Sequence, residues 1–161
     1  MSLSPVFVSF LMFGSSVVGN LHAAELPLAS QAYGELRQDL AVGGGPLHVG
    51  GVAYRNGLGT HAISEIPVTV PPAAVRFSGA VGVDDSQGIG KGSVKFRVLS
   101  GNAVLWESPV LKSGDIAVPF NLVVPATRHR KIYLQADDLG DNSYDHADWP
   151  DLKWETGTPL P

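Results

Sequence analysis

The stretch SVKFRVLSGNAVLWES (residues 93–108) has the pattern of a β-hairpin. Apolar and polar side chains alternate with a period of two, as they do when one face of an extended strand is buried. The dipeptide Gly101-Asn102 tolerates the positive φ angles that a tight turn requires. The residues expected on the buried face are Val94, Phe96 and Val98 before the turn and Val104 and Trp106 after it. This stretch therefore predicts two antiparallel strands.

The same alternation extends in both directions along the chain. It recurs over residues 65–70, 75–83, 116–124, 131–136 and 151–155. The residues expected to face the core are Val75, Phe77, Val81, Val83, Ile116, Val118, Phe120, Leu122, Val124, Ile132, Leu134, Leu152 and Trp154. Pro119 points the other way and has no N–H to give to a neighbour, which predicts an edge strand or a bulge. At least seven short strands, roughly 10 to 15 residues apart, predict an all-β fold, an antiparallel β-sandwich or jelly roll.

Residues 1–23 are predicted to be a secretory signal peptide. An apolar run from Pro5 to about Val18 is too short to span a bilayer comfortably and precedes the small residues Ala23 and Ala24. The head of the segment lacks Lys and Arg, so an uncleaved membrane anchor is the alternative. Cleavage leaves residues 24–161 as a single secreted or periplasmic domain, long enough to bury a core.

The composition narrows the class of partner. The chain has no cysteine, so apolar burial must hold an exported fold together, with or without a bound ion. The net charge is −4 and the Lys and Arg residues are scattered, which argues against nucleic acid as the main partner. An acidic surface also disfavours an anionic membrane once the leader is removed.

Two segments rich in glycine and polar residues lie near opposite ends of the chain, at 34–64 and 135–150. Loops of a sandwich gather at the sheet edges, where a rigid scaffold can hold binding groups. Rings and hydrogen-bonding side chains together suit a neutral polyhydroxylated ligand, whose C–H face packs on a ring while its hydroxyls need partners. The candidate side chains are Tyr54, Arg55, His61, Tyr144, Asp145, His146, Asp148 and Trp149. The alternative is structural: Trp149 and Trp154 as core, and His61 with Asp148 as a buried pair.

Metal chemistry is the second hypothesis. His146 and Asp148 are two residues apart in a non-helical segment, and no compact three-ligand spacing indicates zinc. Calcium fits better, because VDDSQG (83–88) and ADDLGDN (136–142) supply hard oxygen ligands without the EF-hand spacing. The candidate ligands of a structural calcium ion are Asp84, Asp85, Asp137, Asp138 and Asp141. Turns capped by Asp side chains explain both segments equally well.

No sequence signature indicates catalysis. The chain has no nucleophile elbow, and GGGPLHVGG (43–51) does not lead from a strand into a helix as a dinucleotide-binding loop must. A glycosidase needs two carboxylates across a cleft, which many acidic loops would satisfy by chance. We therefore expect a protein that is not an enzyme.

Three ordered motifs resemble the NPCBM family of carbohydrate-binding modules. They are AYGELRQDLAVGGGPLHVGGVAYRNGLGTHAISEI (32–66), RFSGAVGVDDSQGIGKGSVKFRVL (76–99) and LQADDLGDNSYDHADWPDLKWE (134–155). The resemblance implies a galactose-binding-like β-sandwich, joined to secreted glycoside hydrolases, that recognises galactose-containing glycans and often holds a structural calcium ion. The matching positions are Tyr54, Gly57, Gly59, Thr60, His61, Ala62, Asp84, Asp85, Asp145, His146, Asp148 and Trp149. The chain departs from the family at Arg55 and Asn56, where a Lys precedes the glycine, and at Tyr33, where a Trp is common.

We expect GTHA (59–62) and DHADW (145–149) to meet and close one site, since first and last strands of such sandwiches are often neighbours. On an extended backbone His146 and Asp148 point one way, and Asp145 and Ala147 the other. A few hydrogen bonds and one stacked ring predict weak monosaccharide binding, with a Kd on the order of 0.1 to 1 mM. No catalytic domain follows in this sequence, so we expect a free lectin-like protein, a subunit of a glycoside hydrolase, or a module for protein contacts.

Overall fold

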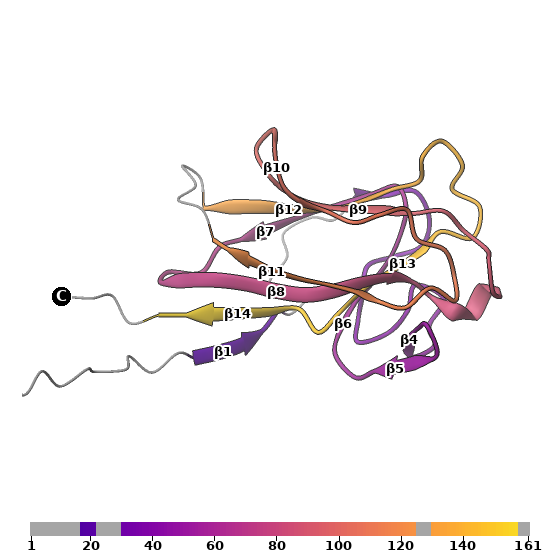
Figure 1. The fold of residues 1–161 in the computed structure, drawn as a ribbon, viewed down its shortest axis with the longest axis horizontal. Coiled ribbons are helices and arrows are strands. Elements are labelled where there is room, and N and C mark those ends of the chain that lie inside the picture. Colours follow the sequence, from indigo (N-terminus) through magenta and orange to yellow (C-terminus); the bar gives the residue numbers. More distant parts are fainter. Residues whose placement is uncertain (1–16, 22–29, 125–129, 158–161) are drawn as a thin grey trace, which may run out of the picture.

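The protein is a sandwich of two antiparallel β-sheets (Figure 1). The computed structural model describes residues 17–21, 30–124 and 130–157. The predicted all-β architecture is confirmed, and within the described residues the only helical element is one 3-10 turn, η2 (Asp85–Gln87). Among these residues, no helix is long and apolar enough to cross a membrane.

The first sheet has seven strands and is built around the long strand β8 (Ala74–Val83). Its other strands are β1 (Val17–Asn20), β14 (Lys153–Thr156), β13 (His146–Pro150), β6 (Gly57–His61), β3 (Arg37–Gln38) and β11 (Val118–Val123). β11 pairs with β8 and, within the described part of the chain, with no other strand. Pro119 therefore lies on an edge strand, as predicted from its missing N–H.

The second sheet has five strands, in the order β10-β9-β12-β7-β2. They are β10 (Ala103–Glu107), β9 (Lys95–Ser100), β12 (Lys131–Asp137), β7 (Ser64–Thr69) and β2 (Ser30–Gln31). A small hairpin, β4 (Leu47–Val49) with β5 (Val52–Tyr54), lies beside the end of β13. The hairpin predicted from residues 93–108 is β9 with β10.

The core lies between the sheets and is made by alternate residues of their strands. Phe77, Phe96 and Leu134 are at most 1% exposed, and the Phe77 ring lies 4.4 Å from that of Trp154. Burying each such side chain stabilises the fold by about 1.5–3 kcal/mol. Because the chain has no cysteine, this burial takes the place of disulfides.

Three residues expected in the core are exposed instead. Val104 is 54% exposed because a bulge between Val104 and Trp106 breaks the alternation of β10. Ile116 is 78% exposed because it precedes β11, which begins at Val118. Val75 is 41% exposed near the open end of β8.

The predicted leader overlaps the first sheet. Gly19 pairs with Trp154, and the N–H of Leu21 donates to the Leu152 carbonyl at 3.1 Å. Leu21 is 4% exposed and packs in the core. Residues 1–16 and 22–23 lie outside the described residues, so cleavage after residue 23 stays a prediction, and it would remove this strand.

Candidate binding face

The two motifs expected to meet are neighbouring strands. β6 and β13 pair antiparallel, with His61 opposite His146, Thr60 opposite Ala147 and Gly59 opposite Asp148. The Ala62 N–H donates to the Asp145 carbonyl at 3.0 Å and extends the ladder by one bond. The expectation that GTHA and DHADW lie side by side is therefore confirmed.

The inner face of β13 belongs to the core. Trp149 has no exposed surface, and its ring meets that of Phe96 edge-on at 5.2 Å and lies 6.3 Å from that of Phe120. A ring sealed between two others cannot stack on a ligand. The prediction that Trp149 contacts sugar is therefore wrong, and its alternative, a core residue, is confirmed.

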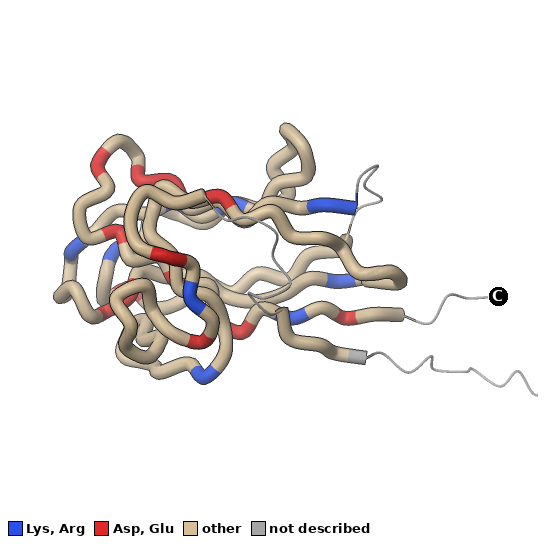
Figure 2. The backbone as a smooth tube through the Cα atoms, turned by 180° about the vertical axis from the view of Figure 1, so that it is seen from behind, with Lys and Arg blue, Asp and Glu red and all other residues tan. Residues whose placement is uncertain are grey.

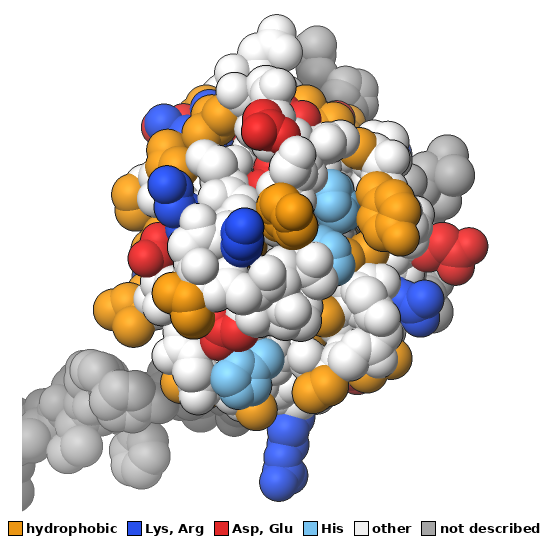
Figure 3. Space-filling model, turned by 90° about the vertical axis from the view of Figure 1, so that its right-hand side faces the viewer, with side chains coloured by type: hydrophobic (Ala, Val, Ile, Leu, Met, Phe, Trp, Pro, Cys, Tyr) orange, Lys and Arg blue, Asp and Glu red, His pale blue; other side chains and the backbone are white. Residues whose placement is uncertain are grey.

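The outer face at the start of β13 carries a row of rings, which we call the imidazole recess (Tyr33, His61 and His146). The His61 ring lies 5.3 Å from that of Tyr33 and 5.4 Å from that of His146. Figure 3 shows imidazole surface in a shallow hollow between hydrophobic side chains on this face. Tyr33 is 64% exposed, whereas His61 and His146 are 6% and 8% exposed. The imidazoles therefore form the floor of the recess, with an exposed ring beside them.

The protonation of the two imidazoles follows from their contacts. Nδ1 of His61 donates to the Ala62 carbonyl at 2.6 Å, which leaves Nε2 as an acceptor. Nδ1 of His146 is buried and has no hydrogen-bond partner among the described residues, so its proton is expected on Nε2. Burial, and then the neighbouring His61, lower the pKa of His146, which keeps the ring neutral at pH 7.

Tyr144 lies two residues before His146, and its backbone has a positive φ of 66°. Its carbonyl accepts a hydrogen bond from the His146 N–H at 2.9 Å, and its ring is half exposed. The ammonium of Lys91 lies 5.0 Å from the centre of that ring. This cation–π contact orients the Tyr144 ring.

Asp148 is enclosed by glycines and by the loop that covers them. Its neighbours in the ladder are Gly59 and Gly82. A Cβ on Gly59 would overlap the Leu40 carbonyl, and one on Gly82 would overlap the Val49 side chain. Both glycines are therefore required for the covering chain to approach so closely. The prediction that Asp148 contacts sugar is wrong, because it has no exposed surface.

The surroundings of the Asp148 carboxyl favour its protonated form. Among the described residues neither of its oxygens has a hydrogen-bond partner of good geometry, and the nearby backbone N–H of His48 only opposes the rise of its pKa. Burial raises its pKa well above the usual value, and so does the hydrogen bond with the Asp84 carboxyl beside it. A protonated Asp148 can donate its O–H to Asp84, which satisfies two buried carboxyls with one proton.

Asp145 is a brace and is also fully buried. One of its oxygens accepts the Ser93 N–H at 2.7 Å, and the other has no partner among the described residues. Burial raises the pKa of Asp145 to about 6, against the opposing effect of the Ser93 hydrogen bond. The prediction of Asp145 as a sugar contact is wrong for the same reason as that of Asp148.

Tyr54 and Arg55 lie at the opposite end of the β6–β13 pair. Gly57 is opposite Pro150, four residues from the His61–His146 pair, or about 13 Å along a strand. Tyr54 lines a separate hollow with Asp151 and Lys153, and Arg55 is exposed. The structure therefore does not bring these two residues together with the recess.

Most acidic residues lie in the loops at the end of the sandwich away from the C-terminus (Figure 2). Asp84 accepts the N–H groups of His48 at 3.0 Å and Ser86 at 2.9 Å. Asp85 accepts those of Gly50 at 3.2 Å, Gly51 at 2.8 Å and Gly114 at 3.0 Å. These are the capped turns that were the alternative to calcium.

The second acidic segment is capped in the same way. Asp137 binds the Arg97 guanidinium at 2.7 Å, and Asp138 and Asp141 accept the N–H groups of Gly140 and Ser143. Within the described residues, no three His, Cys, Asp or Glu side chains converge as a metal site. Oxygens that already accept N–H groups fit calcium poorly, and calcium at either segment stays a prediction.

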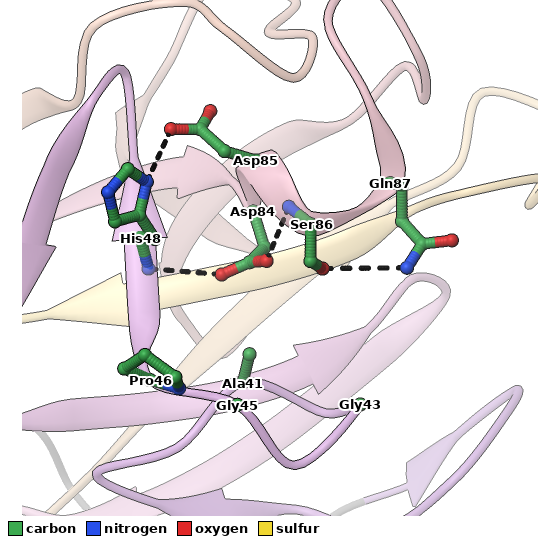
Figure 4. A pocket seen from close by; sticks show the side chains of 9 residues that line it. All are labelled: Ala41, Gly43, Gly45, Pro46, His48, Asp84, Asp85, Ser86 and Gln87. Carbon is green, nitrogen blue, oxygen red and sulfur yellow. Dashed lines mark hydrogen bonds and ion pairs between the residues drawn. The ribbon is translucent and has the colours of Figure 1, made fainter.

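A cavity of about 490 Å³ lies beside the recess (Figure 4). Along one wall stand His48, Asp84, Asp85, Ser86 and Gln87, and along the other Ala41, Gly43, Gly45 and Pro46. The sequence analysis considered the segment GGGPLHVGG (43–51) only as a phosphate-binding loop and rejected it, so it did not predict that this segment lines a cavity. The sequence analysis noted Tyr33 only as a difference from the Trp that is common in the family, and it did not consider Lys91 or His48.

A small antiparallel sandwich whose rim carries rings and imidazoles has the architecture of a sugar-binding module. The family model described as NPCBM/NEW2 domain matches residues 19–155. The chain belongs to this family of carbohydrate-binding modules. It is 46% identical over 136 residues to a protein named alpha-1,3-galactosidase B from Akkermansia muciniphila, covering 83% of this chain and 17% of that protein.

Solved structures agree with the fold. The CBM51 of a Clostridium perfringens GH95 protein, in complex with methyl-galactose, has a TM-score of 0.74 at 27% identity, over 86% of this chain and 99% of that one. The CBM51-2 and INT domains of Clostridium perfringens ZmpB, in complex with GlcNAc, give 0.71 at 26% identity, over 84% and 30%. The galactose-binding-like sandwich is therefore confirmed.

Proposed function

We propose that this domain is a non-catalytic module that binds a galactose-type residue of a glycan in the imidazole recess. The observation that carries the proposal is the row of Tyr33, His61 and His146, with ring centres 5.3 and 5.4 Å apart. It combines an exposed ring with two imidazoles whose Nδ1 atoms have different surroundings, so that their Nε2 atoms differ in hydrogen-bonding character.

The chemistry of the row suits a sugar. Nε2 of His61 is available as an acceptor and Nε2 of His146 as a donor, so adjacent hydroxyls of a pyranose find one of each. The C–H face of the sugar can pack on Tyr33, which is exposed enough to receive it. One ring and a few hydrogen bonds support a Kd on the order of 0.1 to 1 mM for a monosaccharide.

Galactose is the preferred sugar on two grounds. The relative with 46% identity is named as a galactosidase, and a similar solved module holds methyl-galactose. A second similar module holds GlcNAc, so N-acetylglucosamine is the competing outcome. The chain covers 17% of the galactosidase, so a glycoside hydrolase partner is part of the proposal.

Titration calorimetry with methyl galactoside, galactose and GlcNAc tests the proposal. Tyr33→Ala is expected to weaken galactoside binding at least tenfold with an unchanged melting temperature, because Tyr33 is 64% exposed. Tyr133→Ala is the matched control, since it removes a partly buried tyrosine from the other sheet. Equal losses in both variants, or tighter binding of GlcNAc than of galactose, would contradict the proposed site or sugar.

The non-catalytic role is supported by the burial of the three carboxyls that stand in the family motifs. Asp84, Asp145 and Asp148 have no exposed surface, so they cannot flank a glycosidic bond as a glycosidase requires. Aryl galactosides are expected to remain intact with the purified domain. Hydrolysis that disappears in a single Asp or Glu variant would overturn this part.

A protein-interaction module without a sugar ligand is the second candidate. It is favoured by the same burial, since Asp145, Asp148 and Trp149 are internal braces. A glycan array separates the two candidates, because a braced scaffold without a ligand predicts no signal for any sugar, with or without calcium.

We also propose that the protein is exported from the cytoplasm. The apolar leader supports a secreted or periplasmic location, where glycans and their hydrolases meet. Cell fractionation is expected to recover the protein outside the cytoplasm, with a new N-terminus measurable by mass spectrometry. Recovery in the cytoplasm with the intact N-terminus would contradict it.

A further inference from the structure

We infer that the cavity between η2 and the Gly43–Pro46 segment is a second sugar subsite, which takes the residue next to the one in the imidazole recess. The inference rests on the proposed function and deepens it, since it makes a disaccharide or longer glycan the ligand. The cavity measures about 490 Å³, and it is open to solvent next to the recess.

The two sites share a wall. Gly43 lines the cavity, and a Cβ on Gly43 would lie 3.5 Å from Cε1 of His146, on the floor of the recess. From the other side, the Asp84 N–H donates to the His146 carbonyl at 2.8 Å, and Asp84 also lines the cavity. A ligand that fills the recess therefore lies within one sugar unit of the cavity.

The two walls differ in the way that the two faces of a sugar differ. Ala41 and Pro46 give an apolar wall, against which C–H groups can pack. Ser86 and Gln87 face them across the cavity (Figure 4) and carry a hydroxyl and an amide. The contact between these two side chains is 3.4 Å long, so their hydrogen-bonding capacity is available to a hydroxylated ligand.

The polar wall is held rigidly. Nδ1 of His48 lies 2.8 Å from Asp85, whose carboxylate also binds the N–H groups of Gly50, Gly51 and Gly114. This fixes the imidazole orientation although the side chain is 42% exposed. A histidine fixed in this way at a cavity wall is prepared for a ligand before the ligand arrives.

Gly45 keeps the cavity open without being required by the fold. Its backbone is outside the positive-φ region, and a Cβ there would meet no atom within 4 Å. By contrast, Gly44 has a φ of +95°, which explains its identity. The absence of a side chain at position 45 is therefore explained by the space that the cavity needs.

Calorimetry with methyl galactoside, lactose and α-1,3-linked galactobiose tests the inference. The unchanged protein is expected to bind at least one disaccharide about tenfold more tightly than methyl galactoside. Gly45→Leu is expected to abolish that preference and to keep the monosaccharide affinity. Asn102→Leu adds the same side chain at the exposed β9–β10 turn and is expected to change neither.

A second variant guards against a distorted loop. Gln87→Ala removes one polar group from the wall, so it is expected to reduce the disaccharide preference at least threefold with an unchanged melting temperature. Equal affinity for one and two sugars, unaffected by Gly45→Leu, would overturn the second subsite and leave the recess intact. Failure of every sugar to bind would overturn the proposed function as well.

Discussion

The two acidic segments, 83–88 and 136–142, look alike in the sequence and differ in the structure. In the first, Asp84 is fully buried, and Asp85 accepts N–H groups from two separate loops. In the second, each carboxylate caps its own turn, as Asp141 does for Ser143 two residues away. The first segment ties two separate loops to itself, whereas the second mainly caps its own turns and reaches a distant strand through the ion pair between Asp137 and Arg97.

The difference shows what decides the role of an aspartate in such loops. An Asp-rich turn in isolation offers oxygens to its own backbone. When other loops direct N–H groups at the same oxygens, the side chain becomes a crosslink between segments far apart in sequence. Gly51 and Gly114 are such donors to Asp85, 34 and 29 residues away. No local pattern in the sequence reports these donors.

The largest effect is expected from Asp85→Ala. It removes the acceptor of three backbone N–H groups and the partner of His48, and hydrogen bonds to a charged group contribute about 1.5–3 kcal/mol each without full additivity. We expect the free energy of unfolding to fall by about 4 kcal/mol, measured by urea denaturation.

Asp141→Ala is the matched control from the other segment. Its carboxylate bonds only within its own exposed turn, so no shift of the denaturation midpoint is expected. A loss as large as that of Asp85→Ala would break the distinction between a crosslink and a local cap.

The strands were predictable because burial on one face imposes a period of two, and this alternation can be read from neighbouring residues in the sequence. Phe96 and Val98 of β9 show it, and they are buried. The exposure of Val104 was not predictable, since a bulge depends on how the partner strand pairs. The burial of Asp148 was equally hidden, because it requires Gly59, Gly82 and a covering loop from three other parts of the chain.

The second prediction concerns Asp145, which follows the second acidic segment but is buried like the first. Its pKa rises from 3.8 in the unfolded chain to about 6 in the folded protein. The folded state thus holds this proton more tightly, so the contribution of Asp145 to stability is greatest below about pH 4 and falls as the pH rises to about 6. The fall amounts to at most about 3 kcal/mol from this group.

Asp145→Asn isolates this contribution, because Asn cannot ionise and keeps the oxygen that accepts the Ser93 N–H. Thermal melts from pH 3.5 to 7 are expected to show a difference between the two proteins that changes between pH 4 and 6. Asp148, whose pKa is also raised, contributes equally to both curves and cancels. Parallel curves across that window would show that Asp145 is not a buried acid.

For the site, sequence reasoning found the paired strands and the two imidazoles and missed Tyr33. His61 and His146 were recognised because both stand in motifs, and strand pairing brought them together. Tyr33 joined them from a segment before β3, through tertiary packing. Trp149 was misplaced because a tryptophan in a polar motif gives no sign of which face of its strand is buried.

The third prediction concerns the ion pair between Arg97 and Asp137, at 2.7 Å. Arg97 also binds Glu107 and Gln135, so the cluster spans three neighbouring strands on the outer face of the second sheet. Both partners are partly exposed, and such pairs contribute about 0.2–1 kcal/mol in water. Asp137→Asn is expected to lower stability by about 0.5 kcal/mol, less in 1 M salt.

The smallest effect is expected from chelation, and it examines both acidic segments at once. Their carboxylate oxygens accept N–H groups or bind Arg97, so a calcium ion would have to displace existing hydrogen bonds. An ion that binds only the folded state raises the melting temperature by mass action, and removing it lowers that temperature. We expect EDTA to leave the melt unchanged and excess calcium to restore nothing. A melting temperature that falls by several degrees with EDTA and recovers with calcium would contradict this expectation. If Asp85→Ala or Asp137→Asn abolished that fall, the calcium ion would lie at the segment of the substituted residue.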